Sequence, residues 1–184
     1  MFKKFFIILL IIFNYPISTL AEKVVVFEFT EQEFETLEVR KVRGSNGKTK
    51  YSLGMNENGS FLRAEAKGTA SGLGKKVKID LNKTPFINIT WKIEKDLKGI
   101  DEKSKKGHDF AARVFVVKKT GLTALSNKAV NYVFSSNNST NEFWRSPYTK
   151  ISIDYVLSTT KDNLNEWVTV KANVKDHFKK LHDL

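Results

Sequence analysis

The stretch Ile87-Asn88-Ile89-Thr90-Trp91-Lys92-Ile93 has the clearest pattern in the chain. Apolar and polar residues alternate along it, and successive side chains of a β-strand point to opposite faces of a sheet. The stretch therefore predicts a strand whose apolar row, including Trp91, faces a core. Its polar row faces solvent or a groove.

Residues 110–117 repeat this alternation and predict a second strand. We expect one row to point into the same core as the first strand, because its members are all apolar. They are Phe110, Ala112, Val114 and Val116. The opposite row is mixed and consists of Asp109, Ala111, Arg113 and Phe115.

Seven further segments combine β-branched or aromatic residues with turn residues at their ends, which predicts additional strands. They are residues 24–29, 50–53, 61–66, 75–80, 129–135, 151–157 and 167–174. Helical periodicity is weak, and we expect one helical turn at residues 176–181. Many short strands at hairpin spacing predict an all-β fold, an antiparallel β-sandwich or jelly roll.

Composition excludes several classes of protein. The 184 residues include 31 Lys and Arg, 20 Asp and Glu, three His and no Cys. The 41% apolar content is too high for a disordered chain, and the missing cysteines exclude disulfide scaffolds and zinc ribbons. We expect no cofactor and no metal site. Residues 22–184 are expected to form a single domain, because no linker or repeat divides them.

The first 21 residues have the three regions of a secretory signal peptide. Lys3 and Lys4 precede an apolar run at residues 5–13, and the segment ends in Thr19-Leu20-Ala21. The run is too short for a transmembrane helix, which needs about 20 apolar residues. We expect cleavage after Ala21, no membrane span in the product, and a periplasmic or secreted protein. Its net charge would be lower than +11 by the two lysines that are removed.

Five residues are candidates for a ligand site: Asp109, Arg113, Tyr132, Trp144 and Arg145. In a regular strand Asp109 and Arg113 share one face about 13 Å apart, so they converge on a ligand rather than on each other. A carboxylate and a guanidinium beside aromatic rings suit a sugar, because they bind its hydroxyls while a ring stacks on its face. Alternatively, Arg113 pairs with an acid across the sheet and Asp109 caps the preceding loop.

Two segments are expected to surround this site. Trp144 and Arg145 lie in residues 141–148, an aromatic segment without strand periodicity that suits the rim of a ligand site. The charged segment 95–106 is expected to be a solvated loop, and its length also suits a rim or lid.

Signatures of catalysis are weak. His108 titrates near neutral pH, but Asp109 beside it points to the opposite face of a strand, so the two should not meet. Ser71 lacks the spacing of a Gly-x-Ser-x-Gly nucleophile elbow. We therefore expect a non-catalytic protein that binds a glycan or another envelope ligand. The alternative is a polysaccharide hydrolase or lyase in which Asp109 is the acid or base and Arg113 neutralises a uronate.

Several blocks resemble a known family when they are taken in order. They are Ala70-Ser71-Gly72-Leu73, Trp91-Lys92-Ile93, residues 107–117, Asn131-Tyr132-Val133-Phe134-Ser135, Glu166-Trp167, Asn173-Val174 and Asp176. They are similar to the bacterial domain-of-unknown-function family 3047 (DUF3047). The resemblance implies an exported β-sandwich and supplies no activity.

The chain also departs from the pattern of that family. His108 stands where the family tends to an acid, Phe134 where it tends to Trp, and Ala172 where it tends to Arg. The resemblance implies a further acidic turn and a closing strand after the Asp176 region, whereas this sequence ends at Leu184. Either the gene is cut short or the domain closes differently. A missing strand would leave an unpaired sheet edge.

The positive charge implies acidic partners. A nucleic acid is not expected, because the lysines are scattered through loops and form no basic aromatic module. Loose attraction to anionic lipid headgroups or to acidic glycans, such as an acidic envelope polymer, is the more economical use of the charge. The sequence leaves the oligomeric state open.

Overall fold

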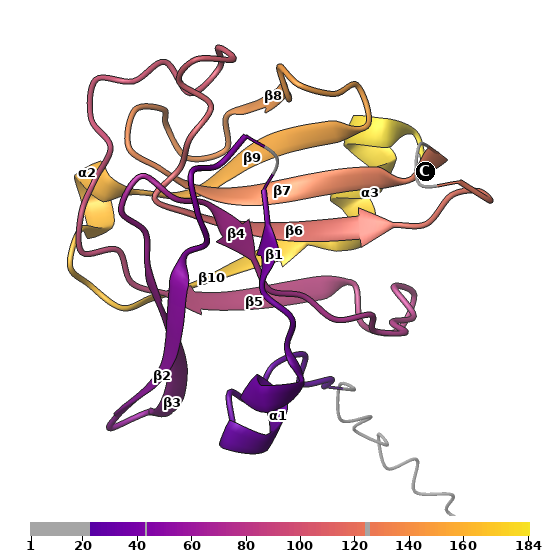
Figure 1. Ribbon diagram of the computed structural model, residues 1–184. Coiled ribbons are helices and arrows are strands. Elements are labelled where there is room, and N and C mark those ends of the chain that lie inside the picture. Colours follow the sequence, from indigo (N-terminus) through magenta and orange to yellow (C-terminus); the bar gives the residue numbers. More distant parts are fainter. Residues whose placement is uncertain (1–22, 43, 124–125) are drawn as a thin grey trace, which may run out of the picture.

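The computed structural model describes residues 23–42, 44–123 and 126–184, and these residues form mainly β-strands (Figure 1). The predicted signal peptide, residues 1–21, lies outside the described residues. The elements are α1 (Glu31–Thr36), β1 (Arg40–Lys41), β2 (Lys50–Asn56), β3 (Gly59–Glu65), β4 (Ser71–Gly72), β5 (Phe86–Trp91), β6 (Ala112–Lys118), β7 (Lys128–Ser135), β8 (Phe143–Arg145), β9 (Ser152–Thr159), α2 (Thr160–Asn163), β10 (Val168–Asn173) and α3 (Val174–His182). The predicted all-β class is confirmed. None of the described helices is long and apolar enough to cross a membrane.

A four-stranded sheet with the order β6-β7-β9-β8 forms the centre of the fold (Figure 1). Strand β8 lies at its edge and pairs antiparallel with β9. Strand β9 lies between β8 and β7 and runs parallel to β7. The chain reverses direction once between β7 and β8 and again between β8 and β9. The predicted antiparallel arrangement is therefore wrong for β7 and β9. It is correct for the other described strand pairs.

One face of this sheet, which we call the inner face, packs on the β5–β10 pair and on α3. The Trp91 ring of β5 packs at a tilt against Phe134 of β7 with 5.2 Å between ring centroids, and its Nε1 donates to Ser158 Oγ over 3.0 Å. The buried core consists of Ile89, Trp91, Ile93, Val130, Tyr132, Phe134, Tyr155, Ala172, Val174 and Phe178. The predicted core row of residues 87–93 is confirmed, with Ile87 half-buried against this cluster.

The second predicted strand, residues 110–117, is β6, which begins two residues later than expected, at Ala112. Its later core residues pack on the inner face as expected: Ala112, Val114 and Val116. Phe110 packs instead on the opposite face with Val133 and Val156, so its assignment to the inner core is wrong. Asp109 Oδ1 accepts from Phe110 N over 2.9 Å, and Asp109 N donates to Gly107 O over 2.7 Å. These bonds hold a turn, in which strand alternation does not apply.

Two predicted strands, at residues 24–29 and 75–80, are absent from the described structure. The first segment leads into a helix, because Thr30 Oγ1 accepts from Glu33 N and Glu33 accepts from Phe29 N. Thr30 is therefore the N-cap of α1, and the Glu33 carboxylate binds the backbone just before it. Lys75, in the second segment, forms an ion pair with Glu33. Neither segment has a partner strand among the described residues, so residue types that favour strands were not sufficient to form one.

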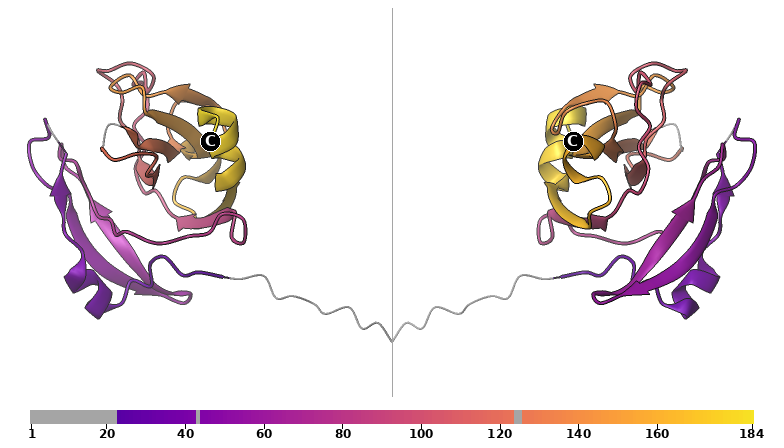
Figure 2. Two further views of the ribbon diagram at one scale, coloured as in Figure 1. Left: turned by 90° about the vertical axis from the view of Figure 1, so that its right-hand side faces the viewer. Right: turned by 90° about the vertical axis from the view of Figure 1, so that its left-hand side faces the viewer.

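The N-terminal part of the chain lies to one side of the central sheet (Figure 2). Its main element is the β2–β3 hairpin, in which Asn56 pairs with Gly59 across a two-residue turn. Phe61 contacts Trp167 edge-on, with ring centroids 5.1 Å apart, and Arg63 forms a 3.1 Å ion pair with Glu94. These contacts join the hairpin to the remainder of the fold.

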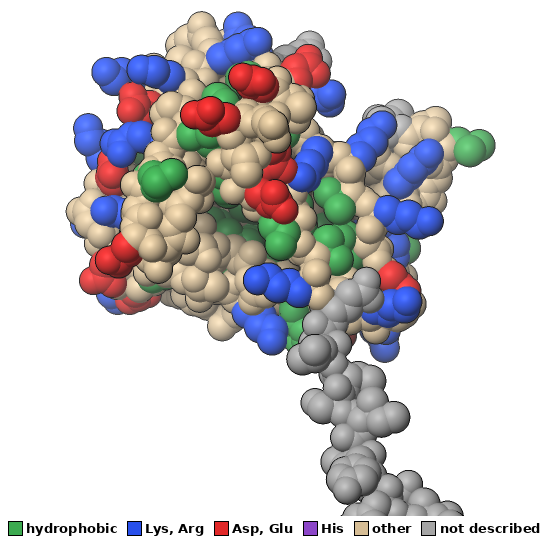
Figure 3. Space-filling model, turned by 90° about the horizontal axis from the view of Figure 1, so that it is seen from below, with side chains coloured by type: hydrophobic (Ala, Val, Ile, Leu, Met, Phe, Trp, Pro, Cys, Tyr) green, Lys and Arg blue, Asp and Glu red, His purple; other side chains and the backbone are tan. Residues whose placement is uncertain are grey.

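Charged side chains are distributed widely over the face seen from below (Figure 3). Lys and Arg side chains lie towards both sides of this view, and Asp and Glu side chains lie among them. The positive charge on this face is therefore not confined to one cluster.

Candidate functional site

The second face of the central sheet, the outer face, carries a row of side chains with one from each strand. The register pairs Phe115 with Asn131, Asn131 with Asp154, and Asp154 with Trp144. Asn131 and Asp154 are 2% and 0% exposed, whereas Phe115 at the edge is 58% exposed. A carboxylate buried in the middle of a sheet requires hydrogen-bond donors or positive charge around it.

His108 and Asn131 supply these interactions to Asp154. His108 Nε2 lies 2.7 Å from Asp154 Oδ2, and the His108 side chain is 5% exposed. Asn131 Nδ2 donates to Asp154 Oδ1 over 2.8 Å and to Ser152 Oγ over 2.7 Å. A carboxylate only accepts, so the geometry places a proton on His108 Nε2. We call His108, Asn131, Ser152 and Asp154 the polar base of the site.

Glu102 fixes the loop that brings His108 to this position. Its side chain is fully buried and accepts hydrogen bonds from Ser135 Oγ, Ser136 N and Asn138 Nδ2. The expectation of a solvated loop at residues 95–106 is correct for its exposed lysines. It is wrong for Glu102, which attaches the loop to the end of β7.

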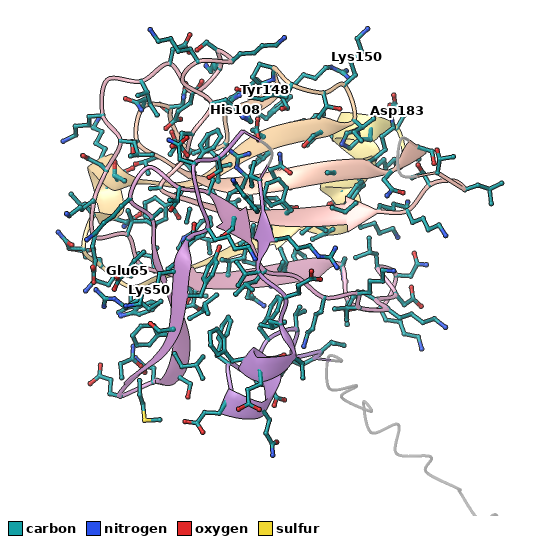
Figure 4. The ribbon with its side chains drawn as sticks, in the orientation of Figure 1. Lys50, Glu65, His108, Tyr148, Lys150 and Asp183 are labelled. Atoms are coloured by element: carbon teal, nitrogen blue, oxygen red, sulfur yellow. The ribbon has the colours of Figure 1, made fainter. Side chains whose placement is uncertain are left out.

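Six side chains form a continuous cluster that shares His108 with the polar base, and we call this cluster the outer stack. They are His108, Phe110, Arg113, Phe115, Trp144 and Tyr148. The His108 ring lies 5.4 Å from that of Tyr148 and 5.3 Å from that of Phe110. Figure 4 shows His108 and Tyr148 side by side near the upper edge of the sheet.

Arg113 occupies the middle of the outer stack. Its guanidinium lies 4.4 Å from the Phe110 ring and 5.3 Å from the Phe115 ring, and Phe110 also stacks with Trp144 at 6.2 Å. Arg113 forms no ion pair with another described residue. Cation–π contacts therefore hold Arg113 in place and leave its N–H donors for another partner.

Burial and nearby acids act on Arg113 in opposite directions. Burial lowers the pKa of its guanidinium, and the negative charges of Asp154, Asp109 and Glu102 oppose this change. An arginine stays protonated in proteins because its pKa is so high. The outer stack therefore has one fixed positive charge with three carboxylates around it.

Two buried polar atoms on this face have no hydrogen-bond partner among the described residues. They are Asn131 Oδ1 and Trp144 Nε1, an acceptor and a donor. Both side chains neighbour Asp154 in the row across the sheet. The face therefore retains hydrogen-bonding capacity that the described side chains do not use.

The structure brings together some of the residues that were predicted for a site. Arg113 and Trp144 both lie in the outer stack, although Trp144 belongs to strand β8 rather than to a loop. Asp109 is exposed beside the stack and caps Phe110 N. Arg145 is exposed and donates from Nη1 to Lys150 O over 2.9 Å.

Tyr132 lies apart from these residues. It is fully buried on the inner face, and its hydroxyl lies 3.0 Å from His177 Nδ1. Burial raises the pKa of Tyr132, so the hydroxyl stays protonated and shares a hydrogen bond with His177. The central sheet separates Tyr132 from Arg113, because Tyr132 is paired with Val114, the next residue of β6.

Asp154 was not among the predicted site residues. Asp154 interrupts an otherwise apolar or small strand, Ile151-Ser152-Ile153-Asp154-Tyr155-Val156-Leu157. An acid within such a strand is a signal for a buried polar site, because an unpaired carboxylate is costly in a core. Tyr148 was not singled out, although it ends the segment 141–148 that was predicted as a rim.

The chemistry available at the site is that of aromatic stacking, hydrogen bonding and one cation. Among the described residues, no group of three His, Cys, Asp or Glu side chains is placed to hold a metal ion. The exposed rings of Phe115 and Tyr148 offer apolar stacking surface, and Arg113 offers hydrogen-bond donors beside them.

Comparison with known proteins gives a family and no activity. The family described as a protein of unknown function, DUF3047, matches residues 35–183. This match runs from before β1 to the end of α3 and includes the outer stack and the polar base. No curated protein and no solved structure matches the chain. The chain belongs to the DUF3047 family.

Proposed function

We propose that this protein binds a glycan, or another hydroxyl-rich ligand of the cell envelope, at the outer stack without catalysing a reaction. Arg113 carries the proposal, because its guanidinium lies between two aromatic rings and has no ion-pair partner among the described residues. Such a guanidinium donates to ligand oxygens, and a neighbouring ring packs on the C–H face of a sugar.

The polar base supports this function by holding the stack in one arrangement. Asp154 fixes His108, and His108 lies between Phe110 and Tyr148. A binding surface that is ordered before the ligand arrives loses less conformational entropy on binding. The polar base is therefore proposed to act by positioning the stack.

Charge favours hydroxyl-rich ligands over polyanions at this site. The three carboxylates that influence Arg113 repel anionic groups. Asp109 is the exposed one of the three, and its Oδ2, which has no partner among the described residues, is free to accept a hydrogen bond from a ligand hydroxyl. We propose that most of the ligand is uncharged and that Arg113 binds its hydroxyl or carbonyl oxygens.

The proposed function includes a finer fold class and a location. We propose a β-sandwich in which β5, β10 and α3 form the layer opposite the central sheet, supported by the single core between them. We also propose a single domain at residues 22–184 that is exported to the periplasm or the medium after cleavage at Ala21. The order of basic, apolar and small residues supports export.

One observation favours an enzyme as a second candidate. His108 with Asp154 behind it resembles a general base whose orientation is fixed by a carboxylate, and Arg113 is placed to neutralise a uronate. In this alternative His108 is the base and Asp154 orients it, so Asp109 is no longer the proposed acid or base. Asp109 lies at the exposed edge and is engaged with Phe110 N. The candidate is a polysaccharide lyase or hydrolase.

A glycan array followed by a polysaccharide pull-down tests the proposal. The purified protein should retain a defined set of glycans, and Arg113→Ala should lose them while Arg145→Ala retains them. Each bound glycan is then incubated with the protein and assayed for new reducing ends and for unsaturated uronates. Their absence supports binding alone, and their appearance supports the enzyme. Equal retention by both variants would contradict the outer stack as the site.

A further inference from the structure

Seven basic residues converge at one end of the central sheet, where β6 and β8 finish and β7 and β9 begin. They are Lys118, Lys119, Lys128, Arg145, Lys150, Lys179 and Lys180, and we call them the basic end. We propose that the basic end docks the protein on the surface of an anionic lipid bilayer. This inference does not depend on the ligand proposed for the outer stack.

The register of the strands places the sheet residues of the basic end together. Lys118, the last residue of β6, is paired with Lys128, the first residue of β7. Arg145 is the last residue of β8, and its Nη1 donates to the carbonyl oxygen of Lys150, just before β9. Residues far apart in the sequence therefore lie at one end of the sheet, because two of its four strands end there and the other two begin there.

Helix α3 adds its last turn to the same end. His182 Nε2 lies 2.9 Å from Ala129 O, at the beginning of β7. Lys118 Nζ lies 5.9 Å from the ring of Phe178 in the same helix. Lys179 and Lys180 are exposed on this last turn. The end is on the right in Figure 1, beside the C-terminus, and faces the viewer in the left panel of Figure 2.

The basic end has a large excess of positive charge. Six of its seven side chains are exposed and Lys128 is half-buried. None of the seven forms an ion pair with another described residue. Residues 117–120, 126–129, 145–151 and 178–184 together contribute one acid, Asp183. In Figure 4, Asp183 and Lys150 both lie at this end of the sheet. Such an excess attracts an anionic surface.

An exposed apolar side chain distinguishes a bilayer from a soluble polyanion. Leu122, in the connection between β6 and β7, is 101% exposed. It lies in the chain between Lys119 and Lys128. At a bilayer the lysines remain at the lipid phosphates while a leucine enters the boundary with the acyl chains. A soluble acidic glycan offers the charges but no apolar layer for Leu122.

Co-flotation with lipid vesicles tests this proposal. The purified protein is mixed with vesicles of phosphatidylcholine alone or with added phosphatidylglycerol. The wild type and all variants are purified in the same way, so that they have the same N-terminus. The triple variant Lys119→Ala/Lys150→Ala/Lys179→Ala should bind the anionic vesicles about a hundredfold more weakly, since each lysine near such a surface contributes about fivefold. Leu122→Ser should also weaken binding, with no change in thermal melting.

The control triple Lys95→Ala/Lys98→Ala/Lys161→Ala removes the same charge elsewhere. Leu97 N and Gly99 N donate to Ser136 and Asn137 beyond the end of β7, and Lys161 follows β9, so these lysines lie at the opposite end of the sheet. The control should change binding by less than about threefold. If both triple variants weakened vesicle binding equally, binding would depend on net charge alone, and the proposal would be overturned. Retention on polygalacturonate without binding to anionic vesicles, or binding to neither, would also overturn it.

Discussion

His108 Nε2 lies 2.7 Å from Asp154 Oδ2, although 46 positions separate the two residues in the chain. The contact joins the loop before β6 to the middle of β9, and it lies directly below the aromatic rings of the outer face. The proposed ligand site therefore depends on a buried polar pair that no local sequence pattern contains.

Asp154→Asn is expected to destabilise the protein by about 3 kcal/mol, because the variant removes one partner from a buried pair. The midpoint and slope of urea unfolding measure this change. Asp109→Asn is the matched control, since Asp109 is exposed and an asparagine also caps a backbone N–H. The control should change stability by about 0.5 kcal/mol or less. Equal stabilities of the two variants would contradict the structural role of Asp154.

Glu102→Gln is expected to loosen the loop at residues 95–107 and to lower stability by about 2 kcal/mol. The carboxylate accepts bonds through both oxygens, whereas a glutamine keeps one acceptor and places an NH2 group against the donors. Amide hydrogen exchange measures the loop, and urea unfolding measures stability. Glu94→Gln removes an exposed acid that pairs with Arg63 and should cost less than about 1 kcal/mol. Unchanged exchange in the Glu102 variant would refute the anchoring role.

His177 is expected to make stability fall below neutral pH. Burial, together with Lys180, lowers the pKa of its imidazole, while Asp176 has a smaller opposing effect. The unfolded chain therefore binds this proton more readily, at an ordinary pKa near 6.5. The contribution of neutral His177 to the stability of the fold is complete above about pH 6.5. It is lost as the pH falls through the lowered pKa of the folded state. Urea unfolding at several pH values should show a weaker pH dependence for His177→Asn than for the wild type, and identical profiles would contradict it.

The proposed export predicts that the mature protein begins at Glu22. Cleavage after Ala21 follows from the order of the basic, apolar and small residues in the first 21 positions. Mass spectrometry of the protein from periplasmic and cytoplasmic fractions measures its N-terminus. A soluble cytoplasmic product that retains Met1 would overturn the proposed export.

Alternation predicted the strands that have an apolar face and a partner. Residues 87–93 and 129–135 became β5 and β7 because both carry rows that the core buries. Residues 75–80 were predicted from similar residue types but gain no partner strand among the described residues, and residues 24–29 lead into a helix cap. Strand pairing is decided by the remainder of the fold, which a local pattern does not contain.

The candidate site was only partly predictable for a similar reason. Arg113 and Trp144 were identified from their residue types, but Tyr132 was placed with them although its side chain points to the inner face. The face of a strand residue depends on register. The pairing of His108 with Asp154 requires β9 to lie beside β7, and that neighbour relationship arises from the reversal through β8.

The most direct test of the central claim is a calorimetric titration of the glycan retained in the pull-down into wild type, Arg113→Ala, Trp144→Ala and Arg145→Ala. Loss of charge-assisted contacts should weaken binding to Arg113→Ala by about 1.5 to 3 kcal/mol, or roughly 10- to 150-fold. Trp144→Ala should also bind more weakly, and Arg145→Ala should retain wild-type affinity. Unchanged affinity in both Arg113→Ala and Trp144→Ala, with normal thermal melts, would contradict the assignment of the outer stack as the ligand site.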